Sequence, residues 1–552
     1  MAATTSTTSE PSRPLRWRTP LLWVLLPLLA GFIAGEQLPG LSPWAPCALA
    51  VAFTVPLAWL TWRDRLTPRT FAGLWLAAAA CLGSAYYLER REPDLPTGWQ
   101  KLPAREVVGE IRIERLFSHF QPDRPQRGIA RLVEASGVET ALERQRLVFE
   151  LPADADLHLG AQYAVVGVIA TPEADGGFAR YLERQGVHLA LDRVRRVEVS
   201  HPGGWWQRSQ DAAQRRLRAV LLPEGFAPTP ARLMLAAMLL GETELLPTPQ
   251  RHAFMASGTL HYFAISGLHV AAVAATLDLL LRLFRLRPKP RTLAGLLLLA
   301  GYIWATGLAA SAVRAGLMIA FWSLAWLWRR QAASLPALVA SAVLVLLWSP
   351  RQLWTPGFQL SYLVAAAIIL YGVPLARWGR ERWLLFPWLP RQSWQWHHHW
   401  RQNIVYGLWS ALSVSLAATL ASWPLSLLYF HISSPGAWLL NVVLAPLASL
   451  AVAAGVLVIG FGLAGLAPLS HFFAYAAWLL LRLMEGAIAQ FLSWPLSSEA
   501  RSWQVDLFAW IVIGGFFACL LRALARRQEG LLRWSLPVLW ILGGVVCFSV
   551  AT

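Results

Sequence analysis

The sequence has little charge and almost no lysine. Only 14% of its 552 residues are charged, and Lys101 and Lys289 are its only lysines, whereas soluble domains carry about 25% charged residues. Hydrophobic residues make up 56% of the chain, which includes 30 tryptophans. A bilayer favours this composition, since indole rings prefer its interface. The composition therefore excludes an ordinary soluble protein and predicts a polytopic α-helical membrane protein.

Motifs for metal, nucleotide and disulfide chemistry are also missing. The sequence has no His-x-His-x-Asp-His cluster and no Gly-rich phosphate loop ending in Lys-Ser or Lys-Thr. We expect the consecutive His397–His399 to be solvated, because adjacent residues rarely converge on one metal. The cysteines lie in apolar runs and have no metal or disulfide spacing: Cys47, Cys81, Cys519 and Cys547. We therefore expect no metal, no cofactor and no catalytic residue.

Apolar runs of roughly 17–25 residues are long enough to cross the hydrocarbon core. Three of them, near 20–36, 43–62 and 70–88, form an N-terminal region, residues 1–90. About ten follow within residues 228–552, near 264–281, 292–309, 315–328, 333–349, 356–374, 404–423, 437–463, 470–493, 503–521 and 532–550. Arginine clusters lie at alternate ends of these runs, and basic flanks stay in the cytoplasm. We expect a cytoplasmic N-terminus, with residues 95–203 and Thr552 outside the cytoplasmic (inner) membrane.

Residues 95–203 differ from the rest of the chain. They carry 14 basic and 15 acidic residues, whereas the remainder carries 34 and 16. Segments such as VVGEIRIERL (107–116), RLVFEL (146–151) and QYAVVGVIA (162–170) alternate or are β-branched, which is typical of half-buried strands. The pattern predicts about five strands in a small all-β domain, an OB-like barrel inserted between the membrane segments.

An amphipathic segment, residues 204–227, follows this domain. Trp206, Ala213, Leu217 and Val220 fall on one face at helical spacing, and the arginines lie elsewhere. Two interpretations remain open at this point. The segment is an interfacial helix lying on the membrane, or a connector packed on the soluble domain.

Polar residues and helix breakers interrupt the second membrane region. The candidate polar residues of a pathway are Glu242, His261, Ser266, His269, Arg314, Gln359, Ser361, His431 and Asn441. The candidate helix breaks are Gly267, Gly357 and Pro424. A polar group in lipid is costly, so it faces a partner or a water-filled cavity, and several such groups in one region predict a polar path through the membrane.

Each of these residues also has a purely structural interpretation. Gly267 can allow close helix packing, His269 can donate to a backbone carbonyl, and Gln359 and Asn441 can join helices by hydrogen bonds. Arg314 differs because a guanidinium keeps its proton and therefore needs an anion, a group of carbonyls or water. Its structural partner would be one of two carboxylates, Asp278 or Glu242.

Together these stretches resemble the ComEC competence family, the inner-membrane channel for single-stranded DNA in natural transformation. The matching segments, in the family's order, are GGFARYLERQGV (176–187), GTLHYFAISGLHVAAVAA (258–275), SAVRAGLM (311–318), SPRQLWTPGFQLSY (349–362) and PLSLLYFHISSPGAWLLNVVLAPL (424–447). Tyr262 and Ala271 replace residues that the family more often writes as Leu and Gly, and we expect neither to matter. The resemblance covers nearly the whole chain from the first helices onward.

The resemblance implies a DNA-conducting channel that is not an enzyme. Long members carry a C-terminal metallo-β-lactamase-like domain proposed to degrade the other strand, and we expect no nuclease activity here because the sequence lacks its metal cluster. The implied partners are single-stranded DNA, membrane lipids, a cytoplasmic ATPase or other motor, a periplasmic DNA-binding protein, a separate nuclease and a second copy of the chain. An OB barrel binds single strands on aromatic and basic residues, and the candidates here are Phe117, Phe120, Arg124 and Arg127.

Two other functions fit parts of the pattern. A secondary transporter for a small solute also uses broken helices with polar groups at the midplane, but the sequence has no clear duplicated motif pair. A membrane enzyme acting on a lipid-linked substrate needs paired carboxylates or a metal, and Glu242, Asp278 and Glu485 are scattered along the chain.

Overall fold

The computed structural model describes residues 19–38, 40–63, 67–91, 104–117, 125–136, 145–152, 157–172, 182, 186–223, 229–494, 499–503, 506–525 and 532–551. Within these ranges the chain forms two compact units. The first contains the N-terminal helices together with residues 317–353, and the second contains residues 94–316 and 354–552. Each unit is described by itself below.

The first unit is a set of apolar helices packed through small residues. It contains α2 (Leu22–Gln37), α3 (Trp44–Trp62), α4 (Pro68–Arg90), the later part of α11 (Ala310–Leu327) and α12 (Ser334–Trp348). A Cβ on Gly31 of α2 would lie 2.1 Å from the carbonyl oxygen of Ala80 on α4. Glycine at this point therefore allows the two backbones to approach closely, as small residues do between membrane helices.

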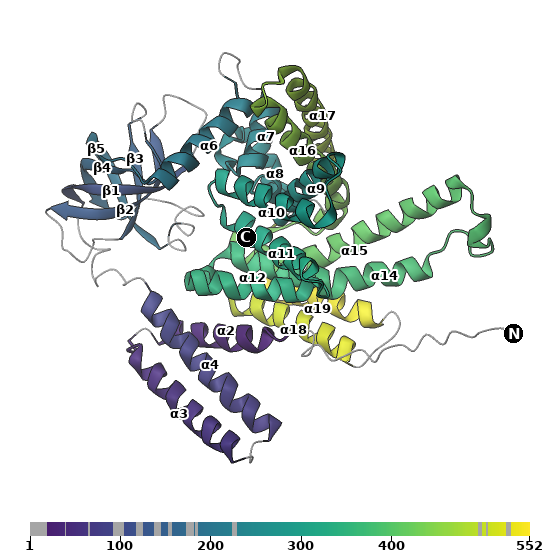
Figure 1. Ribbon diagram of the computed structural model, residues 1–552, viewed down its shortest axis with the longest axis horizontal. Coiled ribbons are helices and arrows are strands. Elements are labelled where there is room, and N and C mark those ends of the chain that lie inside the picture. Colours follow the sequence, from purple (N-terminus) through teal and green to yellow (C-terminus); the bar gives the residue numbers. More distant parts are fainter. Residues whose placement is uncertain are drawn as a thin grey trace. The chain divides into compact units, whose positions relative to one another are not determined.

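A closed five-stranded barrel begins the second unit (Figure 1). Its strands are β1 (Arg105–Phe117), β2 (Gln126–Ser136), β3 (Arg146–Leu151), β4 (Gln162–Ala170) and β5 (Val187–His201), in the order β1-β2-β3-β5-β4. All neighbours are antiparallel except β3 and β5. Alternate residues such as Ile111, Phe149 and Tyr163 fill the interior, as the period-2 pattern predicts.

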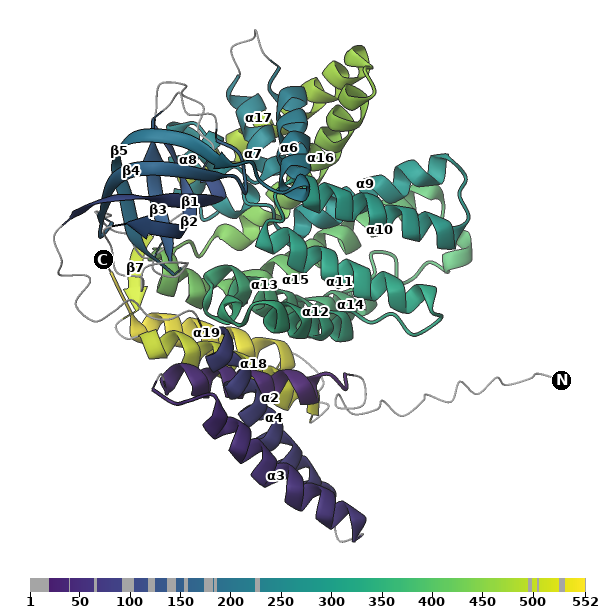
Figure 2. The same ribbon diagram turned by 60° about the vertical axis from the view of Figure 1, so that its left-hand side comes forward.

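The rest of the second unit is mostly helical. Its helices are α6 (Trp205–Leu221), α7 (Pro230–Leu240), α8 (Thr248–Ala256), α9 (Gly267–Leu283), α10 (Pro288–Ala305), the first part of α11, α13 (Pro356–Ala367), α14 (Val373–Arg382), α15 (Trp396–Phe430), α16 (Ala437–Leu463), α17 (Ala467–Leu492), α18 (Asp506–Ala525) and α19 (Leu532–Phe548). A π-helical turn, Ile368–Gly372, joins α13 to α14. Figures 1 and 2 show α16 and α17 as a hairpin that points away from α14 and α15.

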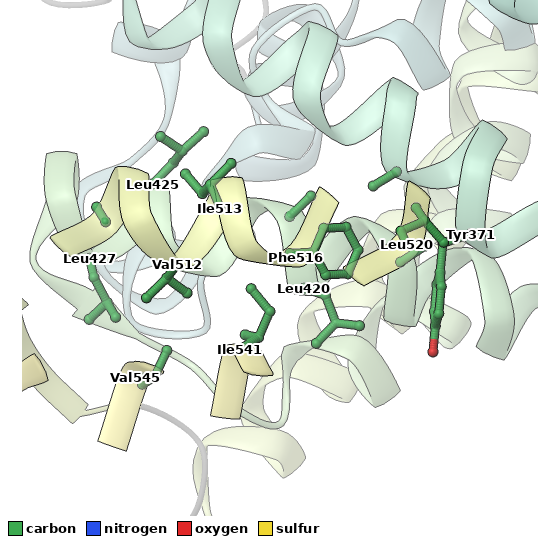
Figure 3. Packing of buried hydrophobic residues seen from close by; sticks show 14 of the residues in the cluster. Tyr371, Leu420, Leu425, Leu427, Val512, Ile513, Phe516, Leu520, Ile541 and Val545 are labelled. Atoms are coloured by element: carbon green, nitrogen blue, oxygen red, sulfur yellow. The ribbon is translucent and has the colours of Figure 1, made fainter. Parts of the chain in front are cut away.

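A buried apolar cluster joins helices that are distant in sequence. Tyr371 at the π-helical turn, Leu420 on α15, Phe516 on α18 and Ile541 on α19 pack together (Figure 3). The Tyr371 hydroxyl donates to the Trp534 carbonyl oxygen at 2.7 Å. This hydrogen bond satisfies the one polar group of a ring that is 1% exposed, so the cluster fixes α18 and α19 against the end of α13.

Eight helices among the described residues are long and apolar enough to cross a membrane, by length and composition. Together with the barrel they confirm the predicted fold class, a polytopic α-helical membrane protein with a small inserted β domain. The sequence pattern did not predict a second, small sheet formed by β6 (Ile432–Ser433), β7 (Glu499–Trp503) and β8 (Ser549–Ala551). Thus residues 549 and 550, placed in the last predicted span, extend as a strand beyond α19.

Candidate functional site

Most of the candidate polar residues lie near the N-terminal ends of their helices. His269 is in the first turn of α9, Arg314 lies early in α11, Gln359 and Ser361 lie early in α13, and Asn441 lies early in α16. Hydrogen bonds connect several of these residues to residues on other helices. The structure therefore gathers residues from separate sequence motifs at helix starts, in several distinct contacts instead of one cluster.

Arg314 is a buried cation whose partners are neutral. It is 3% exposed, and its Nη2 donates to the Gly357 carbonyl oxygen at 2.9 Å and to the Ser361 hydroxyl at 3.1 Å. Its Nε is buried without a hydrogen-bond partner among the described residues. Since a buried charge is normally paired, this arrangement leaves a positive site with unused N–H donors.

The carboxylates considered as partners for Arg314 are bound elsewhere. Asp278 pairs with Arg282 at 2.7 Å and with Arg291 at 2.9 Å. Glu242 accepts from the side-chain amide of Gln214 at 3.2 Å and lies 3.9 Å from Arg218. The ion-pair interpretation of Arg314 is therefore wrong for these two residues, and Glu242 serves to hold α6.

Glu485, the third carboxylate considered, contacts Arg482 at 3.3 Å and the Gln250 amide at 3.4 Å. Each of the three carboxylates thus has its own local partner, and the structure does not gather them into a pair. In the described part of the chain, no group of three or more His, Cys, Asp or Glu side chains is arranged to hold a metal ion.

His269 is fully buried and tied to the break before α9. Ser266 caps this helix, and its backbone N–H lies 3.1 Å from His269 Nδ1. The Ala264 carbonyl oxygen lies 3.2 Å from the same nitrogen, which is the contact that the packing interpretation requires. One ring nitrogen cannot accept from one group and donate to the other at once. In either tautomer Nε2 has no partner among the described residues, so the second ring nitrogen is available inside the protein.

Two further polar pairs connect helices at this level. The Gln359 side-chain oxygen accepts from the Tyr429 hydroxyl of α15, and the Asn441 side-chain oxygen accepts from the Tyr262 hydroxyl at 3.2 Å. Tyr262 thus makes a contact that the leucine more common in the family could not make, because leucine has no hydroxyl to donate to Asn441. Both amides act as interhelical hydrogen-bonding groups, as their structural interpretation states.

The candidate helix breaks have different outcomes. Gly267 begins α9, and Gly357 lies in the first turn of α13 after the Thr355 cap. Pro424 does not break a helix, because α15 runs from Trp396 through Phe430. A proline inside a helix removes one backbone hydrogen bond, and membrane helices tolerate this loss when neighbouring groups compensate. The chain turns instead at His431, which adopts a left-handed conformation with φ 55°.

Gly267 also lacks the crowding expected of a packing glycine. A Cβ there would meet only the Cβ of Ala315 on α11, at 3.9 Å, which is ordinary contact. His261 lies on a short 3-10 turn, Leu260–Tyr262, where its Nδ1 is 3.2 Å from the Gly258 carbonyl oxygen.

The barrel candidates that the structure describes have partners within the barrel. Phe117 packs against a small cluster of Ile129, Leu182 and Val187, and Arg127 pairs with Glu150 at 2.7 Å. Phe120 and Arg124 lie outside the described residues.

Helix α6 connects the barrel to the helices. Asp211 pairs with His158 of the barrel at 2.8 Å, and the Gln210 amide donates to the Trp304 carbonyl oxygen of α10 at 2.9 Å. Leu217 is 7% exposed, and the Val220 side chain occupies the space beside Gly462 on α16. Leu217 and Val220 of the predicted apolar face thus contact protein, whereas Trp206 is 50% exposed. The segment is a connector, as one interpretation states, but its apolar contact through Val220 is with α16 and not with the soluble domain.

Sequence reasoning missed several polar residues at the loops near these helix starts. Ser257 and Thr259 are fully buried, and their hydroxyls lie 2.6 Å apart. Ser434 donates to the Ser257 carbonyl oxygen at 3.4 Å, which links the loop before α9 to the loop before α16. Hydroxyl residues are common in loops, so only the position of Thr259 and Ser434 inside the matching segments could have drawn attention to this group.

Comparison with known proteins places this arrangement in a family context. The family model described as competence protein matches residues 238–527. ComE operon protein 3 of Bacillus subtilis (strain 168) is 27% identical over 239 residues, which cover 42% of this chain and 29% of that protein. Uncharacterized protein YcaI of Escherichia coli (strain K12) is 26% identical over 227 residues, 40% of this chain and 28% of that protein. The matched region thus spans less than a third of either relative, and no solved structure matches.

Proposed function

Because the chain belongs to the competence protein family, we propose that this multi-pass membrane protein is a channel for single-stranded DNA. In this proposal it lies in the cytoplasmic (inner) membrane and carries the strand into the cytoplasm during natural transformation. The N-terminus is cytoplasmic, and the barrel lies on the outer side. Arginine clusters beyond α9, α14 and α18 support this orientation, since basic flanks stay inside.

Arg314 is the observation that carries the proposal. A guanidinium that is buried against a carbonyl and a hydroxyl keeps its full charge. DNA phosphates are the anions that would neutralise it, and arginine can hold phosphate oxygens through two parallel N–H bonds. In the proposed orientation Arg314 lies near the outer end of α11, where an arriving strand would enter the membrane.

The neighbouring groups give a path for the rest of the strand. The non-helical backbone before α9 and before α13 is tolerated at membrane depth only where protein or water satisfies its polar groups. Ser266 and His269 lie at the first of these breaks, and Gly357 and Ser361 adjoin the second. We place the passing backbone beside these helix starts, where N–H groups and the positive ends of helix dipoles favour phosphate.

The barrel and the partners complete the proposal. We assign the barrel to the OB type, which its five closed strands support, and give it the task of receiving the strand. The energy source is a cytoplasmic ATPase or another motor, since the sequence has no phosphate loop of its own. A periplasmic DNA-binding protein delivers the DNA, a separate nuclease removes the other strand, and copies of this chain associate in the membrane. The chain itself is proposed to have no enzyme activity.

A stepwise assay tests the proposal. A deletion strain is scored separately for DNA bound to the cell, DNA in the periplasm and DNA that enters the cytoplasm. We expect the first two to persist and the third to be lost, with full recovery when the gene is returned. Loss of periplasmic DNA would place the protein at an earlier step, and normal cytoplasmic entry would refute the channel. Degradation of single-stranded DNA by the pure protein with Zn²⁺, Mn²⁺ or Mg²⁺ would refute the absence of enzyme activity.

A further inference from the structure

We propose that the exposed face of α6, formed by Trp205, Arg208, Ala212 and Arg216, binds single-stranded DNA as it leaves the barrel. These residues recur at helical spacing, so they share one side of the helix. All four are exposed, and the two tryptophans that begin the helix are its only exposed large apolar residues. The proposal rests on the DNA-channel function and names a new contact surface for it.

The arginines of α6 divide into two kinds. Arg215 pairs with Asp211 of the same helix and donates to the Leu157 carbonyl oxygen of the barrel at 3.2 Å, and Arg218 approaches Glu242, so both hold the helix in place. Arg208 and Arg216 have no ion pair among the described residues. They lie eight positions apart, or about 12 Å along the helix axis. Asp211, the one acidic residue of α6, is buried and paired. The exposed face therefore presents only positive charge, which complements a phosphate backbone.

The tryptophans supply a surface for bases. Trp205 is 72% and Trp206 is 50% exposed, and their rings meet edge to face with centroids 5.7 Å apart. Trp206 also contacts Trp304, with ring centroids 5.6 Å apart. Unstacked bases bind on such rings without a sequence preference, so aromatic and basic groups together favour a single strand over a duplex.

The position of α6 fits a transfer between the barrel and the membrane. Figures 1 and 2 show α6 running from the barrel toward α7 and α16. At its start the Gln207 side chain lies against Gly160 of the barrel. Further along, Gln210 binds the end of α10, after which the chain turns into α11 and reaches Arg314. A strand on α6 would thus lie between the barrel and the proposed phosphate site.

A lipid surface is the competing occupant of this face. A helix lying in the membrane interface buries an apolar face among the headgroups. The leucines of α6 are already buried in the protein, with Leu217 7% and Leu221 4% exposed. Apart from the two tryptophans, the side left open carries alanine and arginine. The geometry therefore favours DNA.

The test uses the full chain in nanodiscs of zwitterionic lipid and a labelled oligothymidine. Arg208→Gln with Arg216→Gln should lower the slope of log affinity against log salt by about 1.4, since each phosphate contact contributes about 0.7 for a single strand. Trp205→Ala should lower the affinity roughly tenfold, the loss of one stacked base, and Trp205→Phe should restore most of it. The control is Arg287→Gln with Lys289→Gln, two exposed cations outside α6, which should leave the slope unchanged.

The outcomes separate this inference from the function on which it rests. If the wild-type protein binds the oligonucleotide and the α6 variants bind it equally well, the α6 surface is refuted while the channel stands. An equal loss in the control variant would mean attraction by net charge and would also refute it. With Trp205→p-benzoylphenylalanine, photolysis should give an adduct with the oligonucleotide, and an adduct with lipid alone would assign the face to the membrane. No DNA binding by the wild-type protein would refute both proposals.

Discussion

Replacing Arg314 with glutamine tests the phosphate site most directly. The change removes the charge and keeps a side chain that can donate to the Gly357 carbonyl or the Ser361 hydroxyl. A guanidinium and a phosphate about 4 Å apart attract each other by roughly 4 kcal/mol at an effective dielectric constant of about 20. At about 1.4 kcal/mol for each tenfold change, this loss predicts a roughly thousandfold fall in the entry of DNA into the cytoplasm.

Protein stability should respond much less. The variant loses part of two hydrogen bonds from a charged donor, worth about 1.5–3 kcal/mol each. It also escapes the cost of burying a charge without a carboxylate partner, which is several kcal/mol. These two effects oppose each other, so protein abundance should stay near the wild-type level. Arg314→Lys keeps the charge but loses the planar group of five donors. Its level of DNA entry into the cytoplasm should therefore lie between those of the wild type and Arg314→Gln.

The assay is transformation frequency in a naturally transformable host that lacks its own family member. Periplasmic DNA is followed by fluorescence and the protein by immunoblot. Arg282→Gln is the matched control, because it makes the same replacement in a half-exposed pair with Asp278, worth about 0–1 kcal/mol, and should transform normally. If Arg314→Gln transforms within tenfold of the wild type at equal abundance, the residue has no part in passage. A fall that merely follows lost protein would assign Arg314 a structural role.

Three further predictions concern helix packing, one hydrogen bond and the membrane topology. Gly31→Ala should destabilise the packing of α2 on α4, because its Cβ would lie 2.1 Å from the Ala80 carbonyl oxygen. Gly73→Ala is the control, since Gly73 has open space around it, and it should leave the stability unchanged. Thermal unfolding in detergent compares the two variants. Tyr262→Phe and Asn441→Ala should each lower the free energy of unfolding by about 1 kcal/mol, and the double variant should lower it by no more than the larger single loss. Additive losses would show that this hydrogen bond contributes nothing to stability. A reporter fused after Ser200 should behave as exported, and cytoplasmic activity there would contradict the proposed topology.

Sequence patterns predicted the elements whose burial is periodic. The strands at 146–151 and 162–170 and the helix at 437–463 have the predicted bounds, because alternation and long apolar runs report directly on burial. Pro424 shows the limit of local reasoning, since the rule that proline ends a helix fails where tertiary contacts compensate. The partners of Arg314 were also beyond prediction. A neutral backbone carbonyl 43 positions away has no signal in the sequence. Asp278 and Glu242 were considered because of their negative charge, but both are paired with other arginines.

The small sheet of β6, β7 and β8 has a consequence for the order in which the protein is made. β7 pairs with β6 through Ile432 and Ala500, and with β8 through Ser502 and Val550. The three strands therefore come from points along the chain that leave the ribosome far apart in time. Domains form progressively during synthesis, and contacts between distant segments form late. Helices α15 and α16 would thus enter the membrane with the edge of β6 unpaired, and that edge would be closed only after α17 has been inserted.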